Sequence, residues 1–303
     1  MSEVETFYKD KKVLVTGGAG FIGSHLVEKL VKLGAHVTIL DNFSTGNLNN
    51  LSPIITQINV LYADITSPYS CIKATTNKDI VFHLAAFISV PGSIENPDFC
   101  HKVNVEGTKN ILQACVENKT QTLVLSSSAA VYGDKEDPCT ENDLPNPTSP
   151  YGKSKVEGEK LCKEYAQTSA LATACLRYFN VYGERQDPNG HYAAAAAKFK
   201  QNLLNKKPIT IYGDGKQTRD FVHVSKVVQA NLTIAHIAQQ ENLKGEIFNV
   251  GTGKSINLFQ LVEILEQELN TKTTEFTFLP SRSGDIPHSQ ANCEKYKRVL
   301  AKI

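Results

Sequence analysis

The chain has 303 residues, of which 41% are hydrophobic and 21% are charged. These are ordinary values for a globular protein, so extensive disorder is excluded, and the length allows two domains or one large α/β domain. Lys and Arg total 32 against 31 Asp and Glu, which leaves a formal net charge of +1. Because so balanced a chain has no excess of cations to attract a polyanion, we expect neither a nucleic acid nor a membrane surface as a partner.

The seven cysteines are widely spaced, and none forms a C-x-x-C pair. This pattern fits the reduced thiols of a cytoplasmic protein and gives no zinc signature. The N-terminal segment MSEVETFYKDKK is polar, with acids before bases, so we expect no secretory signal. No apolar run reaches the ~18 residues of a membrane span. The sequence therefore predicts a cytoplasmic location, no membrane association and no metal.

Residues 12–40 have the pattern of a strand, a turn, a helix and a second strand. KVLVT, residues 12–16, is a short apolar run of the kind found in buried parallel strands, and residues 36–40 form another. Between them, apolar residues recur at helical spacing from Ile22 to Leu33. The segment is therefore predicted to form a βαβ unit.

The same alternation continues along the chain. Strands are predicted over residues 58–64, 79–86, 121–128 and 171–183, and helices over 103–118 and 149–168. Strands that alternate with helices indicate a Rossmann fold, a doubly wound parallel sheet that binds its ligands at the carboxyl ends of the strands.

Beyond residue 183 the sequence is richer in turns and polar loops. We expect residues 1–183 to form the cofactor-binding domain, with part of 220–255 returning to it. Residues 184–303 are predicted to form mainly a smaller C-terminal α/β lobe that binds the substrate.

The turn after the first strand is rich in glycine. Residues 17–23 contain four glycines between a predicted strand and a predicted helix, and Asp41 ends the next strand. Such a turn lets the backbone approach a pyrophosphate, whose negative charge the helix N-terminus attracts. The Asp41 carboxylate would accept hydrogen bonds from ribose hydroxyls and repel a 2′-phosphate, and Asn42 rather than an arginine follows it. The sequence therefore predicts a dinucleotide site that takes NAD rather than NADP.

A second glycine-containing turn looks superficially like a phosphate site. Gly253-Lys254-Ser255 resembles the end of a P-loop. The motif also needs a glycine five positions earlier, and Phe248 stands there. We therefore interpret this segment as an ordinary turn.

Tyr151 and Lys155 are four residues apart on a predicted helix, so their side chains share one face. Hydride transfer from an alcohol needs a base, and a tyrosine with a pKa near ~10 can serve when a neighbouring positive charge favours the phenolate. Three other pairs have the same spacing: Tyr8/Lys12, Tyr69/Lys73 and Tyr212/Lys216. Only Tyr151 follows a strand that ends in a cluster of serines, so we expect Tyr151 and Lys155 to be catalytic.

Further segments follow in order along almost the whole chain: TGGAGFIGSHLVEKLVKLGAHVTILDNFSTG, HLAAFISVPGSIENP, NVEGT, SSSAAVYGD, SPYGKSKVEGE, LRYFNVYGERQDPNG, YGDGKQTRDFVHV, FNVGTG and SRSGDIPHS. Together they resemble the extended short-chain dehydrogenases/reductases, specifically the UDP-hexose 4-epimerases of the NAD-dependent epimerase/dehydratase family. This resemblance is more specific than any single motif. It implies an NAD-dependent enzyme that inverts C4 of a UDP-sugar.

The resemblance also implies roles for individual residues. Ser128 would hydrogen-bond the 4-hydroxyl of the sugar with help from Ser127, Tyr151 would be the base, and Lys155 would hold the nicotinamide ribose. The implied cofactor site consists of Gly17, Gly20, Phe21, Ile22, Gly23, Asp41, Asn42, Gly46, Asp64, Ile65, Leu84, Ala85, Ala86, Asn104, Tyr151, Lys155 and Tyr178. The implied substrate site consists of Ser128, Tyr151, Asn180, Arg219, Arg282, Asp285 and Ser289.

Two neighbouring positions argue against related activities. Sugar-nucleotide dehydratases of similar sequence have an acid pair after the end of this strand, and UDP-glucuronate decarboxylases usually have a glutamate near it. Here Ala129 and Ala130 follow Ser128. We therefore expect neither elimination of water nor decarboxylation.

The resemblance suggests which sugar is used. A small residue at Ser289 would admit an N-acetyl group, which favours UDP-GlcNAc/UDP-GalNAc with UDP-Glc/UDP-Gal as additional substrates. A UDP-glucuronate 4-epimerase is the enzymatic alternative, and a non-catalytic NAD-sensing binding protein is the alternative from another class. Homodimerisation through the helices near residues 103–118 and 151–168 is common in the family and is expected here.

Overall fold

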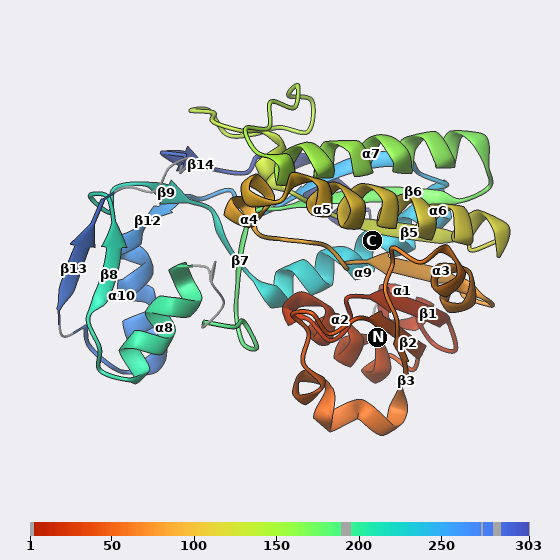
Figure 1. The fold of residues 1–303 in the computed structure, drawn as a ribbon, viewed down its shortest axis with the longest axis horizontal. Coiled ribbons are helices and arrows are strands. Elements are labelled where there is room, and N and C mark those ends of the chain that lie inside the picture. The colour runs from red at the N-terminus through yellow and green to blue at the C-terminus, as the bar shows by residue number, and fades with distance from the viewer. Residues whose placement is uncertain (1–2, 189–194, 274, 281–285, 303) are drawn as a thin grey trace.

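The computed structural model describes residues 3–188, 195–273, 275–280 and 286–302. Its main sheet has seven strands in the order β11-β6-β5-β4-β1-β2-β3, and all neighbours are parallel (Figure 1). The bounds are β1 Lys12–Thr16, β2 His36–Asp41, β3 Asn59–Tyr62, β4 Ile80–His83, β5 Thr122–Ser128, β6 Ala172–Tyr178 and β11 Lys244–Val250. Because the strand order reverses at β1, with β2 and β3 on one side of it and β4, β5 and β6 on the other, the predicted Rossmann fold is confirmed.

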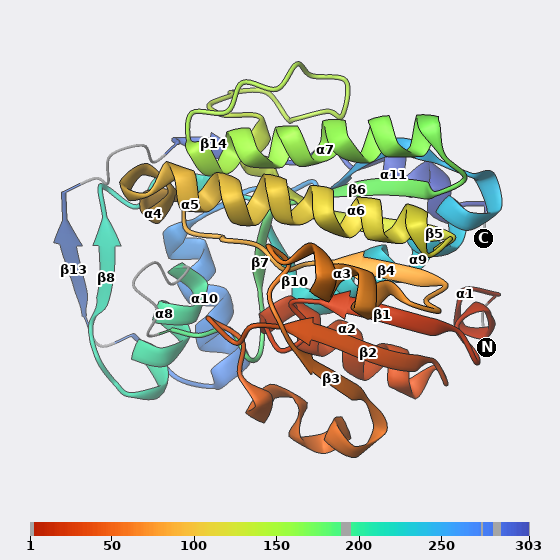
Figure 2. The ribbon, with the colours of Figure 1, turned by 45° about the vertical axis from the view of Figure 1, so that its right-hand side comes forward.

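Helices cover both faces of this sheet, as Figure 2 shows. Val13 and Val15 of β1 belong to the core beneath α2 Phe21–Lys32 and α9 Val224–Glu241, whereas Leu14 belongs to the core on the opposite face. That second core is covered by α3 Pro68–Thr75, α6 Gly107–Glu117 and α7 Pro150–Thr168. The alternation of side chains along a buried strand therefore accounts for the two apolar layers.

Short helical segments connect or flank these elements. They are α1 Glu3–Phe7, η1 Leu48–Gln57, α4 Val90–Glu95, α5 Pro97–His101, the π-helical turn η2 Lys102–Glu106 and η3 Ala129–Val131. The helix predicted over residues 103–118 thus begins in a π-turn and continues as α6. No helix in the described ranges is both long and apolar enough to cross a membrane.

The strand predicted over residues 171–183 is wrong in its second half. β6 ends at Tyr178, and Asn180–Tyr182 forms a separate strand, β7, that pairs with β10 Phe221–His223. The break occurs at Phe179, whose N–H donates to the carbonyl of Val250, while the N–H of Asn180 donates to Asp220. The backbone therefore changes partners at this point and carries Asn180 away from the main sheet.

The smaller lobe has its own apolar core. Phe199, Ile211 and Leu261 are among its buried residues, and they come from α8 Ala195–Leu204, β8 Ile209–Tyr212 and α10 Leu258–Leu269. β8 pairs with β13 Phe276–Leu279, and β9 Thr218–Arg219 lies between β12 Ile256–Asn257 and β14 His288–Ser289. In Figure 1 this lobe lies at one end of the molecule, beyond the carboxyl ends of the main strands.

The chain returns to the main sheet after forming part of the lobe. β11 pairs with β6, and α9 packs in the same core as α2. The last helix, α11 Glu294–Leu300, contributes Val299 to this core and contacts β11. The lobe is therefore held between segments that are anchored in the sheet on both sides.

The glycine turn after β1 depends on two close backbone approaches. Gly17 has φ +68°, and a Cβ there would lie 2.8 Å from the backbone nitrogen of Ala85. A Cβ on Gly23 would lie 2.1 Å from the Gly17 carbonyl oxygen. Since backbone atoms cannot move aside as a side chain can, only glycine allows α2 to start this close to β1.

Gly23→Ala should therefore destabilise the protein by about 1–3 kcal/mol, the usual cost of overpacking a close contact. The matched control is Gly158→Ala in α7, where the new Cβ would meet only side-chain atoms, of Leu125 at 3.3 Å and Thr108 at 4.0 Å. Urea unfolding of both variants measures the difference. Equal stability of the two variants would contradict the proposed backbone clash.

Candidate functional site

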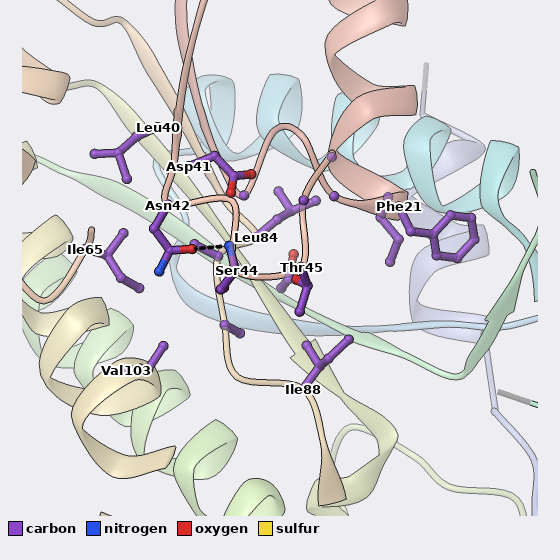
Figure 3. A pocket seen from close by; sticks show the side chains of 18 of the residues that line it. Phe21, Leu40, Asp41, Asn42, Ser44, Thr45, Ile65, Leu84, Ile88 and Val103 are labelled. Atoms are coloured by element: carbon purple, nitrogen blue, oxygen red, sulfur yellow. Dashed lines mark hydrogen bonds between the residues drawn. The ribbon is translucent and has the colours of Figure 1, made fainter. Parts of the chain in front are cut away.

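A cavity of about 220 Å³ lies at the carboxyl ends of the central strands. Figure 3 shows Asp41, Asn42, Ser44 and Thr45 along one part of its wall, Ile65 and Val103 towards one end and Phe21 at the other. The predicted residues that line it are Gly17, Gly20, Phe21, Ile22, Gly23, Asp41, Asn42, Gly46, Asp64, Ile65, Leu84, Ala85, Ala86, Tyr151, Lys155 and Tyr178. The sequence did not single out Leu40, Ser44, Thr45, Ala63, Ile88 and Val103, which also line it.

The start of α2 faces this cavity and can hold an anion. Its N-cap residue is Gly20, and no side chain caps the helix. Uncapped N–H groups at a helix N-terminus carry partial positive charge and point outward, which suits a pyrophosphate. Gly20 and Gly23 leave the space above these groups without side chains.

Asp41 joins the glycine turn to the loop that follows β2. One carboxylate oxygen accepts from the N–H of Ala19 at 2.9 Å, and the other accepts from the N–H of Phe43 at 2.8 Å. The carboxylate is buried but lines the cavity. Each oxygen keeps a further lone pair, so a ribose diol could donate to Asp41 as well.

Asp64 and Asn42 form the adjoining part of the wall. The amide of Asn42 donates to Asp64 at 2.7 Å, and the N–H of Thr66 donates to the same carboxylate at 2.8 Å. Burial alone would raise the pKa of Asp64, but these hydrogen bonds outweigh burial and lower it. Asp64 is therefore a charged hydrogen-bond acceptor at this end of the cavity.

Asn104 does not line the cavity but holds the loop that does. Its side-chain oxygen accepts from the N–H of Phe87 at 2.7 Å, and its amide nitrogen donates to the Phe87 carbonyl at 2.9 Å. The amide also lies 3.0 Å from the Ser154 hydroxyl on α7. Asn104 therefore fixes the loop after β4 against the helix that carries Tyr151.

His83 is a buried support that the sequence reasoning missed. Its two ring nitrogens lie 2.7 Å from the Thr16 hydroxyl and 3.0 Å from the Thr108 hydroxyl. Burial, with a smaller contribution from Lys155, lowers the pKa of His83 to about 3. The ring is therefore neutral at physiological pH and ties the end of β1 to α6.

Tyr151 and Lys155 line the cavity from the first turns of α7. Ser149 caps this helix by accepting from the N–H of Gly152 at 3.1 Å, and Pro150 occupies its first turn. The Lys155 ammonium donates to the Ser126 carbonyl at 2.9 Å and lies 5.7 Å from the centre of the Tyr151 ring. The predicted one-sided placement of the two side chains is thus present.

Burial acts on these two groups in opposite directions. It raises the pKa of Tyr151, and a hydrogen bond with the Ser128 hydroxyl only partly offsets this. It lowers the pKa of Lys155 to about 8, against the opposing effects of Cys100 and Glu159. Desolvation of Tyr151 therefore opposes the phenolate that a neighbouring positive charge would favour.

The three serines at the end of β5 have different surroundings. Ser126 places its hydroxyl 3.0 Å from the Tyr178 hydroxyl, whose pKa burial raises to about 12. Ser127, which lines the first cavity, donates its hydroxyl hydrogen to the buried carboxylate of Glu159 at 2.6 Å. Ser128 is the serine that reaches Tyr151.

A second cavity, of about 600 Å³, lies between the smaller lobe and β7. Asn180 and Arg219 line it, together with Lys198, Phe199 and Tyr212. The Arg219 guanidinium donates to the carbonyls of Thr218 and Pro287 at 2.9 and 3.2 Å. Backbone carbonyls thus fix a cation in the wall of this cavity.

The other predicted substrate residues are placed differently. Ser289 is buried in β14, where it pairs with Arg219 of β9. It is not among the described residues that line the two cavities. Arg282 and Asp285 lie outside the described residues.

The Gly253 turn binds a carboxylate of its own chain. Asp220 accepts from the N–H groups of Thr252 and Gly253 at 2.7 and 2.9 Å, and from the N–H of Ala291 at 3.2 Å. The N–H groups that a phosphate would need are therefore already used. This internal contact also holds the segment after β14 next to Arg219.

Within the described ranges, no group of three or more His, Cys, Asp or Glu side chains is placed so that it could bind a metal ion. All seven cysteines are buried free thiols.

A Rossmann sheet whose ligand cavity begins at an uncapped helix and ends at a tyrosine–lysine pair defines a protein of the dinucleotide-dependent hydride-transfer class. The chain belongs to the NAD dependent epimerase/dehydratase family, whose sequence profile matches residues 13–251. This confirms the family resemblance seen in the sequence, and NAD is the family's cofactor.

Three relatives are similar over nearly the whole chain. A Methanocaldococcus jannaschii protein, provisionally named a UDP-glucose 4-epimerase, is 43% identical over 90% of this chain and 87% of its own length. A UDP-N-acetyl-alpha-D-glucosaminuronate decarboxylase of Bacillus cytotoxicus is 34% identical over 95% and 94%. The UDP-N-acetylglucosamine 4-epimerase of Methanobrevibacter ruminantium, solved with UDP-N-acetylmuramic acid, has a TM-score of 0.89 and 38% identity over 96% and 92%.

The pKa of Lys155 predicts how stability changes with pH. Because its folded value of about 8 lies below the usual 10.5, the unfolded chain binds more protons between these values, so stability rises with pH in that window. Lys155→Met removes this group. Without NAD, the thermal midpoint of the parent should rise relative to that of Lys155→Met as the pH increases from about 8 to about 10.5.

The matched control is Lys153→Met, an exposed lysine of the same helix. Its stability difference from the parent should stay nearly constant over the same range. If the difference in thermal midpoint between the parent and Lys155→Met were also constant over this pH range, the lowered pKa of Lys155 would be contradicted.

Proposed function

We propose that this protein interconverts the C4 epimers of UDP-hexoses with NAD as a bound cofactor, through a transient 4-keto sugar. The proposed substrates are UDP-GlcNAc/UDP-GalNAc, and also UDP-Glc/UDP-Gal. The observation that carries the proposal is the Tyr151–Lys155 pair in the wall of the first cavity, with Ser128 beside Tyr151 and a second cavity lined by Asn180 and Arg219. Family membership and the names of the relatives support it.

The described residues fit NAD. The uncapped start of α2 suits the pyrophosphate, and the Asp41 carboxylate suits a ribose diol but not a 2′-phosphate. Asp64 and Ile65 would contact the adenine, and Tyr178 would lie beside the nicotinamide. Lys155 would hold the nicotinamide ribose. Bound NAD would supply the acceptor for the C4 hydride and would return that hydride to the opposite face.

Proton movement falls to Tyr151. Its phenolate would take the proton of the sugar 4-hydroxyl as hydride leaves, and the phenol so formed would give that proton back when the hydride returns. Ser128 would hold the same sugar oxygen by a hydrogen bond. Because burial keeps the Tyr151 pKa high in the free protein, nearby positive charge must favour its phenolate when ligands bind.

The second cavity would hold the UDP part. Asn180 and Arg219 line it, and Arg282 and Asp285 are proposed to complete it. A guanidinium binds phosphate oxygens through two parallel hydrogen bonds, so Arg219 suits a diphosphate. An anchored diphosphate would retain the 4-keto sugar while the ring turns and presents its other face.

Several further features belong to the same proposal. The protein would work in the cytoplasm, consistent with its seven free thiols, as a homodimer formed through α6 and α7. Residues 1–183, with β11 and α9, would bind NAD, and the lobe mainly built from 184–303 would bind the UDP-sugar. Ala129 and Ala130 argue against the decarboxylation named for one relative, because neither of the two residues directly after Ser128 is an acid.

The proposal is tested by incubating the protein with UDP-Glc, UDP-Gal, UDP-GlcNAc and UDP-GalNAc and following C4 epimers by NMR. Tyr151→Phe should lower turnover at least ~10²-fold, since it removes the general acid–base. Tyr69→Phe is the matched control, because Tyr69 has the same spacing to a lysine but is 74% exposed.

A fifth incubation contains UDP-glucuronate, and turnover of that sugar alone would favour the alternative 4-epimerase. Binding of NAD without turnover of any UDP-sugar would favour a non-catalytic sensor. A near-normal rate for Tyr151→Phe would remove Tyr151 from the proposed role.

The choice of sugar is proposed to depend on Ser289. Because Ser289 is buried in β14 and lines neither cavity, the larger side chain of Ser289→Tyr would have to extend into the neighbouring space, where the N-acetyl group is proposed to lie. The variant should lower turnover of UDP-GalNAc by roughly 10-fold or more while sparing UDP-Gal. Rates with the two substrates on one protein preparation measure the ratio. Ser52→Tyr, at an exposed serine, is the control, and equal loss with both substrates would rule out the gate.

A further inference from the structure

One fully buried ion pair lies directly beneath the proposed site. Arg177 of β6 is 1% exposed and Glu159 of α7 is 5% exposed. The guanidinium donates to the two carboxylate oxygens at 2.8 and 2.7 Å, so the contact is bidentate. The Ser127 hydroxyl donates to the same carboxylate at 2.6 Å.

Each member of this network is next to a residue of the proposed site. Ser127 and Arg177 are cross-strand partners, and the next pair in register is Ser128 with Tyr178. Glu159 lies one helical turn after Lys155 on α7. The pair therefore joins the helix that carries Tyr151 to the two strands that carry Ser128 and Tyr178.

The network continues on the far side of Arg177. The centre of the Tyr132 ring lies 4.6 Å from the guanidinium carbon, and the Tyr132 hydroxyl donates to Asn249 of β11 at 2.6 Å. The Asn249 amide in turn donates to the carbonyl of Cys139 at 2.8 Å. Arg177 is thus held from both sides, and its orientation is fixed.

Stability alone does not explain such a pair. Removing two ions from water is costly, and apolar replacement of a buried pair is often neutral or stabilising. The two charged groups add a defined orientation. A bidentate contact fixes both the distance and the angle between the two side chains, whereas apolar side chains can shift relative to one another and stay packed. The strands at this point could be packed against α7 without charges.

We infer that Glu159 and Arg177 are positioning residues for the proposed epimerisation: their bidentate contact sets the height and rotation of α7, and so places Tyr151 and Lys155 against Ser128. The inference rests on the proposed function. Neither residue touches the substrate. Their loss should therefore change the rate of the chemical step and leave the binding of the UDP-sugar, by Asn180 and Arg219, largely unchanged.

The test uses two variants of the full-length protein with bound NAD. Glu159→Leu/Arg177→Met removes both charges together, so no unpaired ion remains buried, and the fold should persist. Arg177→Lys keeps the opposite charges but loses the planar fork. Both should lower kcat by about 10- to 100-fold with KM for the UDP-sugar within about threefold, the result expected when reacting groups are misplaced.

The matched control is Glu241→Leu/Lys302→Met, which makes the same kind of change at an exposed ion pair 3.1 Å long. It should change neither constant. Parental kcat in a folded Glu159→Leu/Arg177→Met or Arg177→Lys protein would overturn the inference, as would unfolding of both variants, which would make the pair purely structural. If the parent turns over no UDP-sugar, it is the proposed function that fails.

Discussion

The packing of α7 against β5 is the contact on which the arrangement of the site depends. The Lys155 ammonium donates a hydrogen bond to the Ser126 carbonyl, and the backbone N–H of Tyr151 donates one to the Ser93 hydroxyl at 3.1 Å. Ser154, between them, bonds to Asn104. The start of α7 is therefore hydrogen-bonded to the end of β5, to α4 and to the π-turn η2. The position of Tyr151 depends on the correct placement of all three segments.

The two glycine-containing turns show how similar local sequences serve opposite purposes. At Gly20 the helix N–H groups are left without a side-chain cap and face a cavity, so they can bind an external anion. At Gly253 the corresponding N–H groups bind Asp220 of the same chain. The difference lies in a carboxylate distant in sequence, and no local pattern around Gly253 could reveal it.

Periodicity predicted the parts of the fold that depend on burial. The apolar runs of β1, β4 and β5 are buried on both faces, so hydrophobicity identified them, and the family resemblance identified most of the cavity lining. The predicted strand boundary was wrong where hydrogen-bond partners, rather than burial, determine the structure. The run over residues 171–183 contains no Gly or Pro before Gly183, but backbone hydrogen bonds at Phe179 and Asn180 divide it. The contact of Ser127 with Glu159, which is 32 residues away in the sequence, could likewise not be read from the serine cluster itself.

Burial also determines which charges the site carries. It raises the pKa of Tyr151 and lowers that of Lys155, so both neutral forms are favoured when the pair is desolvated. A phenolate is then costly unless cationic charge accompanies it. The Lys155 ammonium is held by a neutral carbonyl, while the nearest buried carboxylate, Glu159, is already neutralised by Arg177. The fold thus keeps unpaired negative charge away from Lys155, and positive charge brought by a ligand can act on Tyr151 without competition from a free carboxylate.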